Sequence, residues 1–121
     1  MSAFFRRAAV SLAVAWLLAL PAAGAAQAPQ GIIQEQVALE NESVRVALLT
    51  FPPGSASGRH QGLDPEMGIV VEGELTLVTD NGREVMRPGT VRWLPALTPH
   101  DARNEGDVAV KLWVVFFKKC D

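Results

Sequence analysis

The apolar segments after residue 30 are short, rich in β-branched residues and bounded by turn residues. This length and composition, with glycine and proline between the segments, predicts β-strands. Asn81-Gly82 separates two of them and is a strong hairpin signal, because both residues tolerate positive φ. No segment carries a capped helical stripe, so the fold class predicted is all-β. The expected strand segments are 43–51, 68–80, 83–89, 90–95 and 108–119.

The segment 68–80 shows how one strand face is buried. Leu75 and Leu77 share one face, whereas Thr76 and Val78 lie on the other, because successive side chains of a strand alternate. Within the same segment "EGE" at 72–74 predicts a bend, in which Gly73 relieves crowding where the strand turns.

The last segment, "VAVKLWVVFFKK" at 108–119, is apolar on both faces. A strand of this kind must be covered on both sides. The cover comes either from a second sheet and a flanking segment of the same chain, or from another subunit. We favour the second alternative, a homodimer.

The N-terminal region has the pattern of a secretory signal peptide. Arg6 and Arg7 precede an apolar run that extends from Ala8 to about Leu20, and small residues follow. The run is shorter than the roughly 18 residues of a membrane span. We therefore expect a signal peptide at 1–26, a linker or edge segment at 27–42 and one domain at 43–119. The protein would be exported to the periplasm or the extracellular space, with no membrane span after cleavage.

The charge argues against a nucleic-acid-binding protein, and the cysteine content excludes a disulfide-stabilised one. Residues 1–26 contain two arginines and no acid, so their removal changes the formal charge from −2 to −4. An acidic domain without a basic patch argues against a nucleic-acid partner. The single cysteine, Cys120, cannot form an intrachain disulfide.

The chain has only two histidines, and both stand in turns beside strand segments. His60 is followed by Glu66, and His100 follows the turn "LPALTP". Two imidazoles and one carboxylate on one face of a divalent metal leave positions open for water or substrate. On residue type alone, surface histidines that form hydrogen bonds remain the alternative. Arg59 and Arg92 are interpreted as solvated.

The residues around His60 resemble the first motif of the cupin family. That motif runs Gly, five residues, His, one residue, His, three or four residues, Glu, six residues, Gly. This chain has Gly54, His60, Glu66 and Gly73 at those spacings, with Gly62 where the second histidine is expected.

The residues around His100 resemble the second cupin motif, which runs Gly, five residues, Pro, one residue, Gly, two residues, His, three residues, Asn. Here Gly89, Pro95, His100 and Asn104 match, and Leu97 replaces the second glycine. Trp93, on the strand segment between Gly89 and Pro95, is interpreted as packed.

The resemblance implies a cupin jelly roll, that is, a double-stranded β-helix barrel. It also implies a divalent metal (Fe, Mn, Zn, Ni or Cu) held by His60, Glu66 and His100, with a small organic ligand in the barrel. Oxygenase-like or isomerase-like chemistry would follow, although no catalytic residue is assigned. Because Gly62 supplies no ligand, the alternative is a non-catalytic ligand-binding cupin with a degenerate metal site.

Overall fold

The computed structural model describes residues 31–118 and confirms the all-β fold, with no helix in that range. The signal peptide predicted at 1–26, Cys120 and the last predicted strand residue lie outside the described residues. No helix in the described part of the chain is long and apolar enough to cross a membrane. The strands are β1 Gln34–Glu40, β2 Val44–Phe51, β3 Glu66–Glu72, β4 Leu75–Thr79, β5 Gly82–Met86, β6 Val91–Leu94, β7 His100–Arg103 and β8 Val110–Phe117.

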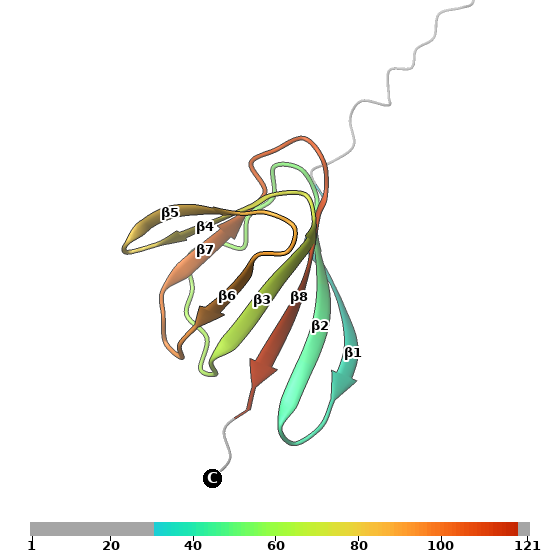
Figure 1. The fold of residues 1–121 in the computed structure, drawn as a ribbon, viewed down its shortest axis with the longest axis vertical. Coiled ribbons are helices and arrows are strands. Elements are labelled where there is room, and N and C mark those ends of the chain that lie inside the picture. The colour runs from blue at the N-terminus through green and yellow to red at the C-terminus, as the bar shows by residue number, and fades with distance from the viewer. Residues whose placement is uncertain (1–30, 119–121) are drawn as a thin grey trace, which may run out of the picture.

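The strands form two antiparallel sheets (Figure 1). The five-stranded sheet has the order β1-β2-β8-β3-β6, and the three-stranded sheet has the order β5-β4-β7. The predicted strand 68–80 is divided between them at Gly73, which has a φ of 77°. The predicted bend at this glycine is therefore the corner at which the chain leaves one sheet for the other.

The core lies between the two sheets. Leu75 and Leu77 of β4 are 2% and 4% exposed, and Val70 of β3 and Val110 of β8 are 1% and 0% exposed. The alternation predicted from the sequence is confirmed at Leu75 and Leu77. Thr76, expected on the other face of β4, is buried as well.

The outer face of β8 explains why its sequence is apolar on both sides. Val110, Leu112 and Val114 point into the core, whereas Trp113 and Val115 are only partly buried. The neighbouring Phe117 packs against Trp93, with ring centroids 5.5 Å apart, although Trp93 remains 47% exposed. A second subunit that covers this outer face stays a prediction.

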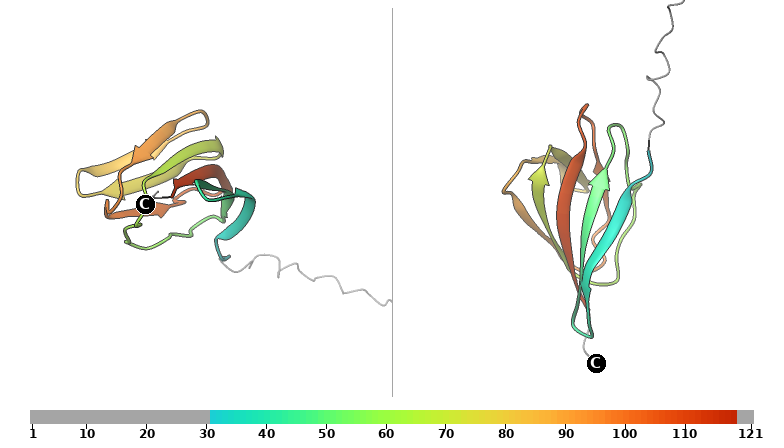
Figure 2. Two further views of the ribbon diagram at one scale, coloured as in Figure 1. Left: turned by 90° about the horizontal axis from the view of Figure 1, so that it is seen from below. Right: turned by 90° about the vertical axis from the view of Figure 1, so that its right-hand side faces the viewer.

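Two strands were not predicted from the sequence. β1 lies within the segment 27–42, pairs only with β2 and is exposed along its whole length, as an edge strand (Figure 2). β7 has the polar sequence "HDAR" and lies beside β4. Both strands carry residues of the candidate site.

Candidate functional site

Backbone pairing between a loop and a strand brings the two histidines together. The loop that follows β2 runs antiparallel to β7 and forms isolated bridges with it, which pair Ala56 with Arg103 and His60 with His100. His60 and His100 exchange two backbone hydrogen bonds of 2.9 Å each. Their rings are cross-strand neighbours, with centroids 4.3 Å apart. Residues forty positions apart in sequence are thereby held side by side.

Both imidazoles are oriented by the same local contact. The Nδ1 atom of His60 lies 2.8 Å from the carbonyl oxygen of Gly58, and Nδ1 of His100 lies 2.8 Å from that of Thr98. A carbonyl oxygen only accepts hydrogen bonds, so each Nδ1 carries the proton. In a neutral ring, Nε2 is then unprotonated, and its lone pair can bind a metal. This arrangement is common in metal-binding histidines.

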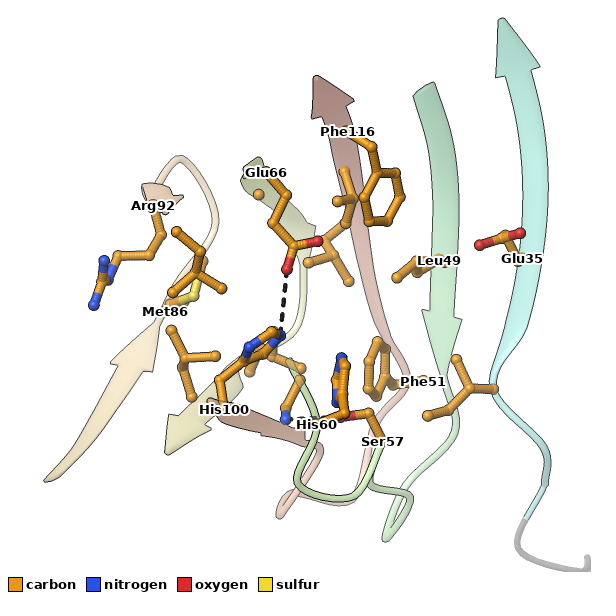
Figure 3. A pocket seen from close by; sticks show the side chains of 18 residues that line it. Glu35, Leu49, Phe51, Ser57, His60, Glu66, Met86, Arg92, His100 and Phe116 are labelled. Atoms are coloured by element: carbon orange, nitrogen blue, oxygen red, sulfur yellow. Dashed lines mark hydrogen bonds and ion pairs between the residues drawn. The ribbon is translucent and has the colours of Figure 1, made fainter. Parts of the chain in front are cut away.

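Glu66 completes the polar part of the site from a different sheet. It begins β3 and pairs with Phe116 of β8 and with Leu94 of β6. Its Oε1 lies 3.2 Å from Nε2 of His100, and the two side chains are 17% and 7% exposed (Figure 3). Both ring nitrogens of His100 therefore face acceptors. The hydrogen bond to Glu66 raises the pKa of His100, and burial partly opposes this effect.

This contact predicts a pH-dependent stability of the metal-free protein. The pKa of His100 is raised above its ordinary value of 6.5 in the folded state. The contribution of the pair is therefore fully present below about pH 6.5 and is lost as the pH rises through the folded-state pKa. In EDTA, urea unfolding is expected to give a higher free energy of unfolding at pH 6 than at pH 9.

Glu66→Gln provides the control for this prediction, because it removes the carboxylate and keeps the size of the side chain. Its free energy of unfolding should fall less between pH 6 and pH 9. If the variant kept the full pH dependence of the native protein, the His100–Glu66 pair would not be its source.

The donor atoms partly fit a divalent metal. Two ligand atoms on one ion, each bound at 2.0–2.2 Å, lie about 3.0–3.4 Å apart. The 3.2 Å between His100 Nε2 and Glu66 Oε1 is compatible with a shared ion as well as with a hydrogen bond. However, within residues 31–118 no three His, Cys, Asp or Glu side chains are grouped closely enough to hold an ion. His60, which is exposed, stays outside such a group.

The three predicted residues line one cavity of about 440 Å³ between the two sheets. In Figure 3 the carboxylate of Glu66 points toward His100, and His60 lies between His100 and Phe51. Sequence reasoning missed Glu35 and Ser57 in this wall, because β1 was interpreted as a linker or edge and the loop carries no strand pattern. The other lining residues are Ile33, Gly68, Leu75, Leu77, Met86, Arg92, Leu94, Ala102, Leu112, Val114 and Phe116.

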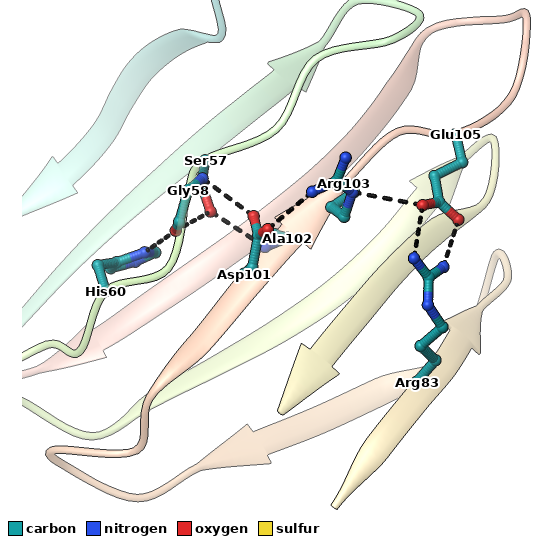
Figure 4. Close-up of polar contacts among 8 residues, drawn as sticks. All are labelled: Ser57, Gly58, His60, Arg83, Asp101, Ala102, Arg103 and Glu105. Atoms are coloured by element: carbon teal, nitrogen blue, oxygen red, sulfur yellow. Dashed lines mark hydrogen bonds and ion pairs between the residues drawn. The ribbon is translucent and has the colours of Figure 1, made fainter. Parts of the chain in front are cut away.

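A second set of polar contacts supports the loop that carries His60 (Figure 4). Asp101 Oδ1 accepts a hydrogen bond of 2.9 Å from the backbone N–H of Gly58, whose carbonyl oxygen holds His60. Arg103 binds the other oxygen of Asp101 at 3.0 Å, and Ser57 Oγ accepts a hydrogen bond from the N–H of Ala102. Asp101 therefore orients His60 through a single residue, Gly58.

The two departures from the cupin motifs contact each other. The backbone N–H of Leu97 donates a hydrogen bond of 2.8 Å to the carbonyl oxygen of Gly62. Leu97 has a φ of 63°, in the left-handed region that favours the glycine expected there. A Cβ at Gly62 would meet only the carbonyl oxygen of Asp64, at 3.6 Å, so this position has room for a side chain.

Comparison with known proteins supports the fold. A family model described as a cupin domain matches residues 47–116. A cupin-domain protein of Bordetella pertussis superposes with a TM-score of 0.64 at 23% identity, over 76% of this chain and 99% of that one. For a cupin superfamily protein of Desulfitobacterium hafniense the values are 0.68, 18%, 83% and 90%.

A sugar phosphate isomerase of the cupin superfamily from Silicibacter pomeroyi is 30% identical, with a TM-score of 0.58. The match covers 64% of this chain and only 52% of the isomerase. No protein with a curated function is significantly similar in sequence.

Proposed function

This chain belongs to the cupin family, and on that premise we propose that it binds a small organic molecule in its barrel beside a divalent metal. His60, Glu66 and His100 would hold the ion. We further propose that residues 1–26 direct export, so that the site works in the periplasm or outside the cell.

One observation carries this proposal. Two imidazoles and a carboxylate, from three separate segments, line the same otherwise mainly apolar cavity. Both rings are held through Nδ1, which leaves Nε2 as the donor atom. Oriented ligands lose less freedom on binding, and oriented imidazoles are a feature of functional metal sites.

The bound metal would supply open positions that polarise an oxygen-bearing ligand or bind dioxygen, as suits isomerase-like or oxygenase-like chemistry. The residues of the chain have separate tasks. Glu66 neutralises charge and sets the position of His100, and the backbone carbonyls of Gly58 and Thr98 hold the two rings. Because His60 lies outside a three-residue group, its exposed loop would have to shift to complete the site.

A second candidate is a non-catalytic binding protein that uses the same cavity without a metal. The observations that favour it are the missing ligand at Gly62 and the absence of a three-residue metal group in the described residues. In that case His100 and Glu66 act only as a hydrogen-bonded pair, which presents polar atoms to the ligand.

Metal binding distinguishes the two candidates. The protein without residues 1–26 is freed of metal with EDTA and titrated with Mn²⁺, Fe²⁺, Ni²⁺, Cu²⁺ and Zn²⁺ by calorimetry. We expect binding of one ion per chain, and a loss of at least about tenfold in affinity for Glu66→Gln and for the double variant His60→Ala, His100→Ala. Glu72→Gln, on the same strand but outside the cavity, is the matched control and should bind as the native protein does.

Gly62→His tests the same site through a gain in metal affinity. Restoring the histidine of the motif should raise metal affinity by about tenfold or more, because an additional imidazole joins the ligands. If neither the native protein nor Gly62→His binds any of the five ions, while both remain folded by circular dichroism, the metal proposal is wrong and the metal-free candidate stands.

A further inference from the structure

We infer that the ligand of the cavity is a mainly apolar molecule of about two rings with a single uncharged oxygen group, and not a sugar phosphate or another polyanion. This inference rests on the proposed function, because it concerns the small molecule that the barrel binds. The wall composition, the cavity size and the pairing of the charged residues support it.

The wall is mostly hydrocarbon. Twelve of the 18 lining residues are apolar or glycine, among them Phe51, Met86 and Phe116. A polyol placed against such a wall would lose its hydrogen bonds to water without replacing them, which disfavours its binding. The cavity of about 440 Å³ is also roughly three times the size of an apolar cavity that accommodates benzene.

The polar side chains that remain available are grouped around His100. His60, on the loop, and His100, on β7, are paired through their backbones and line the cavity. Glu66 approaches from β3 (Figure 3). One hydroxyl or carbonyl group suffices to meet this cluster. Leu49 and Phe51 offer no hydrogen-bonding side chain, and the polar residues near them, Glu35 and Ser57, already bind Arg45 and the N–H of Ala102.

Every charged residue of the wall already has a partner within the protein. Glu35 pairs with Arg45, and Glu66 pairs with His100. Arg92, the one arginine among the lining residues, donates from Nε to Glu84 at 2.6 Å and from Nη1 to the carbonyl oxygen of Trp93 at 2.6 Å.

In Figure 3 the Arg92 guanidinium extends away from His100 and Phe116. In the metal-free protein, a phosphate would therefore have to take Arg92 from its carboxylate partner, or face Glu35 and Glu66 without a cation. With neutral histidines, the formal charge of the wall is that of two glutamates and one arginine. A net negative wall disfavours an anion.

Three probes test the ligand class: two that share the naphthalene rings and one sugar phosphate. Calorimetric titrations use 2-naphthol, 2-naphthyl phosphate and glucose 6-phosphate, each with EDTA-treated and with metal-loaded protein. We expect saturable binding of one 2-naphthol per chain with a Kd below about 1 mM. To the EDTA-treated protein, 2-naphthyl phosphate should bind at least about tenfold more weakly, and glucose 6-phosphate should not bind measurably.

Two variants locate the binding site. Ala102→Phe narrows the cavity from β7 and should weaken 2-naphthol binding at least about fivefold, with circular dichroism and thermal unfolding as checks of the fold. Glu72→Gln, on β3 but outside the cavity, should change 2-naphthol binding less than about twofold.

The outcomes separate this inference from the metal proposal. Naphthol binding to the EDTA-treated protein supports the ligand class even if no metal binds. Tighter binding of 2-naphthyl phosphate or glucose 6-phosphate to the EDTA-treated protein overturns it, as does the absence of naphthol binding to a protein that does bind a metal. Naphthol binding that is unaffected by Ala102→Phe also overturns it, because the probe would then lie outside the cavity.

Discussion

Gly73→Ala is expected to cost about 3–5 kcal/mol in the free energy of unfolding, because the new methyl group meets backbone atoms that have no room to move. A Cβ on this glycine would lie 2.6 Å from the carbonyl oxygen of Ala109 and 3.0 Å from Cα of Val110. Val110 is completely buried in the core. The positive φ of 77° adds the strain of a left-handed conformation.

Gly89→Ala is the matched control for this prediction. Gly89 also has a positive φ, 92°, but a Cβ there meets no atom within 4 Å. Its substitution should cost only about 1–2 kcal/mol, from the backbone conformation alone. Urea unfolding of both variants, with unchanged slopes, measures the difference. Equal losses would show that close packing against β8 is not the reason for a glycine at position 73.

The consequence for function follows from the place of this corner. Gly73 carries the chain from β3 of the large sheet to β4 of the small one, and both sheets line the cavity. A shift of the corner changes the separation of the walls. The inferred two-ring ligand should therefore bind more weakly to any Gly73→Ala protein that still folds.

The sequence predicted strands that have either a buried face or clear turn residues at their ends, as β5 and β6 do, and it missed two that have neither. β4 and β8 were found through Leu75, Leu77 and the apolar run of β8, because burial imposes the alternation. β1 is exposed throughout and is ordered only by pairing with β2. β7 has only four residues, and all of them are polar or small. The local sequence pattern of β1 and of β7 indicates neither of these pairings.

The candidate site was predictable in its residues but not in its geometry. Motif spacing pointed to His60, Glu66 and His100, and all three line the cavity. The cross-strand pairing of the two histidines depends on a loop without strand-like alternation, so no periodicity indicates it. The spacing also suggested a three-ligand group, whereas the described structure brings Glu66 and His100 together and leaves His60 beside them.

Asn104 offers the second large effect, because its side-chain amide is buried and both of its polar atoms are hydrogen-bonded. It is 1% exposed, and its Nδ2 donates to the carbonyl oxygens of Phe51, at 2.9 Å, and Val108, at 2.8 Å. Its Oδ1 accepts from the N–H of Gly106 at 3.0 Å. Its backbone also binds Gly54 and Ser55, where the loop that carries His60 begins.

Asn104→Asp, which preserves size and shape, should cost at least about 3 kcal/mol at pH 7, because it places a carboxylate against two carbonyl oxygens in a buried position. Asn104→Ala should cost a similar amount, since it leaves two carbonyl groups and one N–H unpaired. Asn81→Asp, in the exposed hairpin turn, is the control and should change stability by less than about 0.5 kcal/mol. Urea unfolding gives all three values. A harmless Asn104→Asp would mean that the hydrogen bonds of this side chain contribute little and that the residue only fills space.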